Sequence, residues 1–273
     1  MTYDIEAIKK KIAQLSNPKN GKGNRDKSSA KLTWFKPTLG LNEVRFMPYD
    51  DGNGQPFQQI DYYDSRQLTP RRIVAPVQWG LPDPIAELMA ELSKDRQSDV
   101  TWQLMRQLRL KESHYAPLIV RGQEEKGIQI WEMGQTVLNQ IYAVLAHPDY
   151  VDEFLFDAEK GYDFTITVTD SGKTTNFSGK DYMVKNYDPQ PRRKPSPLAA
   201  TAKERQALVD SIPNLGEYFK GFAMSEDKLK QIVVNFLQAK TTDGLAAPSS
   251  VDERPAQAPS EASRKIDEAF SDL

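Results

Sequence analysis

A short run of basic and aromatic residues stands directly before an apolar segment, residues 116–120. The run contains Arg109, Lys111, His114 and Tyr115. Lysine and arginine neutralise phosphates, and an aromatic ring that stacks on a base contributes about 1–3 kcal/mol. These residue types predict contacts with a single-stranded nucleic acid. A surface loop that leads into a buried strand would give the same pattern.

Aromatic residues elsewhere are numerous, with eleven Tyr, eleven Phe and four Trp in the chain. Adjacent tyrosines in a strand point to opposite faces, so one of a pair should turn away from the core. Some rings should stack on bases, whereas others should belong to the core. The rings for which we expect base contacts are Tyr62, Tyr63, Trp131, Phe177 and Tyr182.

Patterns typical of catalysis or metal binding are scarce. The chain has no cysteine, which excludes disulfides, thiolate metal sites and cysteine nucleophiles. The two histidines, His114 and His147, lack the spacing of metal ligands. Asp26 precedes Lys27 where a phosphate-binding loop needs glycine. We expect a protein that is not an enzyme and that has no metal and no cofactor.

Charge is distributed unevenly along a chain whose formal net charge is −2. Residues 1–36 carry nine Lys/Arg against three Asp/Glu, whereas residues 241–273 carry three against seven. A basic arm and an acidic tail are typical of proteins that bind a polyanion and regulate that contact. Two solvated tails of accidental sign would give the same counts. Two further cations, Arg71 and Arg72, precede an apolar segment in the middle of the chain.

Residues 1–27 form the basic arm. An Ile/Leu stripe at helical spacing in residues 3–16 predicts a short amphipathic helix. Because a helix of about 14 residues is marginal in water by itself, we expect it to dock on a neighbouring protomer. The cations assigned to this arm are Lys9, Lys10, Lys11, Arg25 and Lys27.

Hydrophobic periodicity predicts a mainly β core over residues 28–240. Alternating segments predict strands at 31–35, 42–49, 57–64, 115–120, 127–133 and 162–170. Patterns with a helical period predict helices at 83–94, 99–110, 134–147, 200–211 and 225–238. Asp83 is expected to cap the first of these helices, with Pro84 at its first position. The last helix carries an apolar stripe made by Leu229, Ile232, Val233 and Phe236. The proline-rich segment 188–197 reads as an extended connection. This order predicts an α+β fold, a small β-barrel with a helical insertion at about 76–110 and C-terminal helices.

The acidic tail, residues 241–273, is low in complexity and predicts disorder. Near its end, Ile266, Phe270 and Leu273 are spaced so that a short helix could present them to a partner protein. No apolar run approaches the roughly 20 residues that span a bilayer, so we expect a cytoplasmic protein without membrane contact.

Four motifs, in order, resemble the single-stranded DNA-binding, helix-destabilising proteins of T-even bacteriophages, the gene product thirty-two family. They are NEVRFMPYDDGNGQPF, RLKESHYAPLIV, GIQIWEMGQTVLNQI and SGKTTNFSGKDY, and the terminal IDEAFSDL is similar to the family's acidic end. The resemblance implies an OB-fold core that coats single-stranded DNA in phage replication, recombination and repair. It also implies replication and recombination proteins as partners of the tail, in an infected bacterial host cell.

The same resemblance implies particular DNA contacts. The family's basic, hydroxyl-containing run carries over to Arg109, Lys111, Ser113 and Tyr115. Arg45 lies in the matching Val-Arg-Phe-Met-Pro strand, Trp131 takes the place of a DNA-facing tyrosine, and Phe177 and Tyr182 lie in the last aromatic hairpin. The family's zinc knuckle would fall in residues 75–90, which contain neither Cys nor His. The chain is therefore expected to be a zinc-less variant. An RNA-binding protein of translational control and a phage structural protein without a nucleic-acid role are the alternatives.

Overall fold

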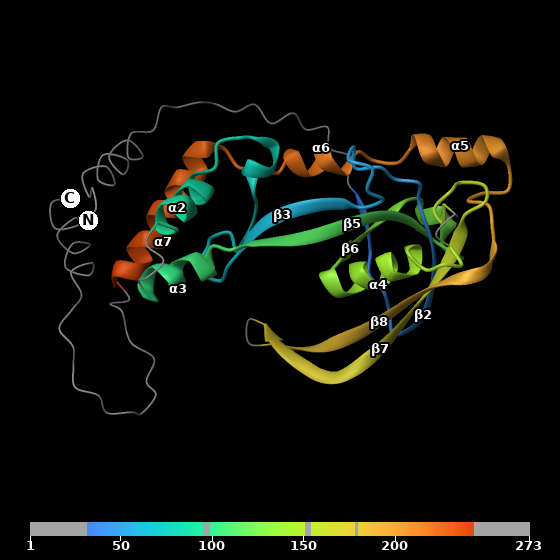
Figure 1. Cartoon of the computed structure of the whole chain (residues 1–273), viewed down its shortest axis with the longest axis horizontal. Helices are drawn as coiled ribbons and strands as arrows, with labels where there is room; N and C mark the ends of the chain where they lie inside the picture. Colours follow the sequence, from blue (N-terminus) through green and yellow to red (C-terminus); the bar gives the residue numbers. More distant parts are fainter. Residues whose placement is uncertain (1–31, 95–98, 151–153, 178–179, 243–273) are drawn as a thin grey trace. The chain divides into compact units, whose positions relative to one another are not determined.

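The computed structural model describes residues 32–94, 99–150, 154–177 and 180–242 (Figure 1). The chain forms two compact units. Of the described residues, the first, here called the sheet unit, contains those in 32–62 and 110–223, and the second, the helical unit, contains those in 63–109 and 224–242. The predictions for the basic arm and the acidic tail lie outside the described residues.

Six strands of the sheet unit form a continuous path in the order β1-β6-β5-β2-β7-β8. The pair β1–β6 is parallel, and the other neighbours on this path are antiparallel. A further strand, β3 (Gln58–Asp64), pairs with β5. The strands of the path are β1 (Thr33–Phe35), β2 (Gly40–Phe46), β5 (Leu110–Val120), β6 (Gln129–Met133), β7 (Tyr162–Phe177) and β8 (Lys180–Pro195).

This sheet curls until side chains of strands that are distant in its order meet. Trp131 on β6 and Tyr187 on β8 have ring centroids 6.2 Å apart, although three strands lie between them in the order. Helix α4 (Gln135–Leu145) adds Val137, Leu138 and Ile141 to the enclosed core. The predicted α+β class is confirmed, and the curled sheet with its helical parts is consistent with an OB-type barrel.

The helical unit has its own core between α2 (Pro84–Leu92), α3 (Asp99–Gln107) and α7 (Glu226–Thr242). The apolar stripe of α7 is buried in this core, which also contains Ile85 and Leu108. As predicted, Asp83 caps α2, and its carboxylate accepts hydrogen bonds from the amides of Ile85 and Ala86. The unit is larger than the predicted insertion at 76–110, because periodicity identifies the apolar face of α7 but not the core that receives it.

The remaining elements are short. The 3-10 helices η1 (Pro76–Trp79) and η2 (Glu124–Lys126) and the strand β4 (Arg72–Val74) connect larger elements. Two short helices lie between β8 and α7, namely α5 (Ala202–Asp210) and α6 (Leu215–Lys220). We predicted α5 but not α6, whose six residues are too few to show a period. Among the described residues, no helix is long and apolar enough to cross a membrane.

The proline-rich segment was predicted wrongly. Instead of a connection, it forms the second half of β8, where Pro189 pairs with Ile166 and Pro191 with Phe164. β8 is the last strand in the order, so among the strands that the structure describes it has a neighbour on one side only. An edge strand tolerates proline because amides on its outer side need no sheet partner.

Candidate nucleic-acid interface

The basic run that precedes the apolar segment becomes the first half of β5. Lys111 is exposed and Ser113 is half-buried, and every residue from His114 to Val120 is buried. Arg109 is exposed and lies between the end of α3 and the start of β5. The cations of this run are therefore accessible to a phosphate backbone, while the strand that follows belongs to the barrel.

Tyr115 is buried, contrary to the expectation that its ring is open to a base. Its ring centroid lies 4.3 Å from that of Phe219 on α6 and 5.9 Å from that of Trp34 on β1. Its hydroxyl is 2.7 Å from the hydroxyl of Tyr62, which is also buried. The unpredicted helix α6 thus covers the outer side of β5 at this position.

The adjacent tyrosines of β3 are both buried, so the expectation that one of them turns away from the core is wrong. Tyr62 belongs to the sheet unit, whereas Tyr63 belongs to the core of the helical unit. The hydroxyl of Tyr63 donates a hydrogen bond of 2.9 Å to the carboxylate of Asp83. Alternation along a strand says that two neighbours face opposite ways, but it does not say whether other segments cover both faces.

Trp131 is a residue of the barrel core. It is buried, its ring stacks on Phe46 with centroids 6.3 Å apart, and it meets Phe35 edge-on at 5.8 Å. A base could reach this ring only if the barrel opened. The contact expected from the resemblance is therefore not available in this structure, and Trp131 stabilises the curl of the sheet instead.

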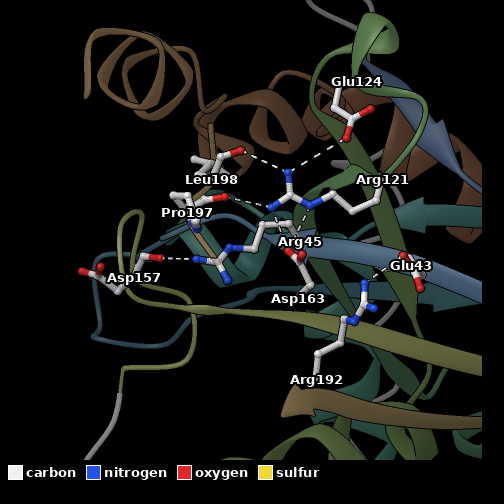
Figure 2. A network of polar contacts seen from close by, with 9 residues as sticks. All are labelled: Glu43, Arg45, Arg121, Glu124, Asp157, Asp163, Arg192, Pro197 and Leu198. Carbon is white, nitrogen blue, oxygen red and sulfur yellow. Dashed lines mark hydrogen bonds and ion pairs between the residues drawn. The ribbon is translucent and has the colours of Figure 1, made fainter. Parts of the chain in front are cut away.

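Arg45 is fully buried and does not reach a surface where a phosphate could bind. Figure 2 shows its guanidinium donating a hydrogen bond through Nη2 to the backbone carbonyl of Asp157. Burial lowers the pKa of Arg45 to about 10, although the nearby carboxylates of Asp163 and Asp157 favour the charged form. The structure thus gives Arg45 a role in holding the loop before β7, and the predicted DNA contact would require that loop to move.

A second arginine extends this network toward the segment after β8. Arg121 donates to Asp163 through Nη2 at 2.8 Å and Nε at 3.0 Å (Figure 2). It also donates to the carbonyl oxygens of Pro197 and Leu198, at 3.0 and 3.2 Å. Since Arg121 follows β5, the network joins β5, β7 and the chain beyond β8, and it serves the architecture of the barrel.

The ribbon made by β7 and β8 carries an exposed aromatic residue of the predicted set. Tyr182 is 48% exposed and pairs with Thr175, and its neighbour Met183 is also exposed. Phe177 pairs with Lys180 in the same ribbon. The predicted hairpin therefore exists, and it places an accessible ring on an extended strand.

The two consecutive arginines before β4 differ in their surroundings. Arg71 is half-buried, and its Nε donates to the carboxylate of Asp64 at 3.0 Å. Arg72, the first residue of β4, is exposed. Arg71 therefore already has a carboxylate partner within its own unit, and Arg72 is the more accessible of the two.

Two exposed tryptophans were not singled out by the pattern analysis. Trp34 lies on β1 and Trp102 on α3, and both are exposed. The signal for Trp102 was present in the sequence, because an arginine follows it at helical spacing, at position 106. No group of three or more metal-ligating side chains occurs in the described part of the chain.

A comparison with known protein families identifies the family of this chain. A family model described as "gp32 DNA binding protein like" matches residues 39–233, well over half of the chain. No curated protein matches the sequence. The matched region contains every strand from β2 to β8 in chain order and most of the helical unit. The chain therefore belongs to the gp32-like family of single-stranded DNA-binding proteins.

Proposed function

We propose that this protein coats single-stranded DNA without sequence preference during replication, recombination and repair of a phage genome. The observation that carries the proposal is the family match over residues 39–233. Binding is the whole activity in this proposal, with no covalent chemistry, no metal and no cofactor. Proteins of this kind combine cations that follow the phosphate backbone with aromatic rings on which successive bases stack.

The accessible members of the predicted set supply both kinds of contact. Lys111 and Arg109 neutralise phosphates, because both side chains are exposed. Tyr182 stacks on a base, since about half of its side chain is exposed on the ribbon. Ser113 and Arg72 complete the contacts of this accessible set, and the proposal also keeps Phe177 as a stacking residue. The buried residues Arg45, Tyr62, Tyr63, Tyr115 and Trp131 support the two cores instead.

The arm and the tail extend the proposal to partners. Residues 1–27 contact a neighbouring protomer on the DNA, and the acidic residues 241–273 compete with DNA for the cations and recruit replication or recombination proteins. Deleting residues 1–27 should leave the affinity for a short oligonucleotide unchanged and reduce clustering on long strands. Equal loss on both lengths would instead make the arm part of the DNA-binding surface.

The direct test is competition between nucleic acids of equal length. We expect an unlabelled oligodeoxythymidine to displace a fluorescent one from the protein, and duplex DNA of the same sequence length to displace it poorly. An RNA strand that competes better than the DNA strand would favour a role in translational control. No displacement and no binding would contradict the proposed function.

A further inference from the structure

Helix α3 carries a tryptophan and an arginine on the side that faces away from its own core. Thr101 and Leu108 are buried, and Leu104 packs against the core of the helical unit. Trp102 is 56% exposed, and Arg106 is exposed as well. Residues four apart share a face of a helix, so the register that buries Leu104 and Leu108 also holds Trp102 and Arg106 outward.

The two outward side chains are in contact. The guanidinium carbon of Arg106 lies 5.5 Å from the centroid of the Trp102 ring, within the range of a cation–π interaction. More than half of the Trp102 side chain remains exposed with the arginine in place. The indole therefore keeps area that a flat ligand can cover, and a positive charge is fixed beside it.

A second cation follows closely. Arg109 is exposed and lies two residues beyond the end of α3, in the same unit. Residues 102–109 thus provide one large exposed ring and two exposed arginines. A ring alone would suit an apolar partner, but a ring with one arginine against it and a second exposed arginine seven residues along the chain suits a polyanion whose bases are unpaired.

We propose that Trp102 and Arg106 form a base-stacking site for single-stranded DNA, at which Arg109 neutralises a phosphate. This inference rests on the proposed function and deepens it, because it assigns a stacking residue on the helical unit. An indole accepts any base, since every base has a π-face, so the site adds affinity without sequence preference. Arg106 holds the indole in place and adds charge next to the strand.

The experiment measures the affinity of the full-length protein for oligodeoxythymidine by fluorescence anisotropy. Trp102→Ala should weaken binding roughly 5- to 150-fold, the equivalent of about 1–3 kcal/mol, and Trp102→Phe should recover part of the loss. Arg106→Ala and Arg109→Ala should each reduce the log–log salt slope by about 0.7. The matched control is Phe154→Ala, which removes a ring that is 58% exposed and belongs to no proposed site, and it should leave the affinity unchanged.

The outcomes separate this inference from the function on which it rests. If the wild-type protein binds DNA and the Trp102→Ala variant binds it equally well, the stacking site alone is overturned. Wild-type protein without affinity for single strands would overturn both. A loss seen only on long strands would assign the surface to contacts between protomers and would also overturn the site. Because Trp102 is exposed, its variants should keep the wild-type melting temperature, so a loss of affinity would not reflect unfolding.

Discussion

Replacing Gly161 with alanine should destabilise the barrel strongly, because no room exists for one additional methyl group. A Cβ at this position would lie 2.5 Å from Nη2 of Arg45 and 2.5 Å from the backbone oxygen of Asp157. It would also lie 2.6 Å from the backbone oxygen of Leu155. Two of the three atoms belong to the backbone of the tight loop before β7, so they cannot rotate away as a flexible side chain would.

The magnitude follows from what must move. Overpacking of this kind costs about 1–3 kcal/mol. The added methyl group also displaces Arg45, whose buried guanidinium then loses the hydrogen bond to Asp157. That loss costs roughly 1–3 kcal/mol more. We therefore expect Gly161→Ala to lower the free energy of unfolding by about 2–6 kcal/mol. That is a large share of the roughly 5–15 kcal/mol that holds an ordinary domain together.

The assay is denaturant unfolding followed by tryptophan fluorescence, with Gly216→Ala as the matched control. A Cβ at Gly216 would meet the side-chain oxygen of Gln58 at 3.2 Å, and that side chain can rotate. Gly216 also lies within α6, where alanine is favoured over glycine by roughly 0.5–1 kcal/mol. A loss below about 1 kcal/mol for Gly161→Ala, or equal losses for the two variants, would refute the role assigned to the buried arginine.

Further predictions concern the core, the ribbon, a histidine and the tail. Trp131→Ala should cost about 3–5 kcal/mol of stability in denaturant unfolding, because it removes a buried ring that several others contact. Tyr182→Ala should instead leave stability unchanged and weaken binding to oligodeoxythymidine by about 1–3 kcal/mol, as measured by titration. Burial lowers the pKa of His114, so below about pH 6.5 the unfolded chain binds more protons than the folded chain. Stability should therefore fall as pH drops through this range, and His114→Gln should remove that component in pH-dependent melts. Truncation after residue 240 should speed DNA association at low salt, and the gain in rate should shrink as salt screens the charge of the tail. Stopped-flow rates that truncation leaves unchanged would mean that the tail only keeps the protein in solution.

Local signals predicted local structure well. The Asp-Pro pair at 83–84 predicted the start of α2, and the cap is present as expected. The four-residue stripe of α7 predicted its buried face, since Leu229, Ile232, Val233 and Phe236 are all buried. Each of these features depends on spacing within one segment, which a sequence displays directly.

Whether an outward-pointing side chain is exposed or covered was harder to predict. Arg45 occupies an outward position on β2, and a loop more than a hundred residues away in the chain covers it. Tyr115 likewise points outward from β5 and is covered by α6, a helix too short to be recognised. Exposure at such positions depends on what packs over the strand. The strand's own sequence does not contain that information.

If the chain binds single-stranded DNA through exposed cations and rings, its affinity for DNA must depend strongly on the salt concentration. A measurement of that dependence is the most direct test. Titrating the wild-type protein with oligodeoxythymidine should give an affinity whose logarithm falls linearly with the logarithm of salt concentration, at about −0.7 per phosphate contact. Lys111→Ala should reduce the magnitude of that slope by about one contact, because its exposed ammonium neutralises one phosphate. Binding that is insensitive to salt, or a slope that Lys111→Ala leaves unchanged, would contradict the account.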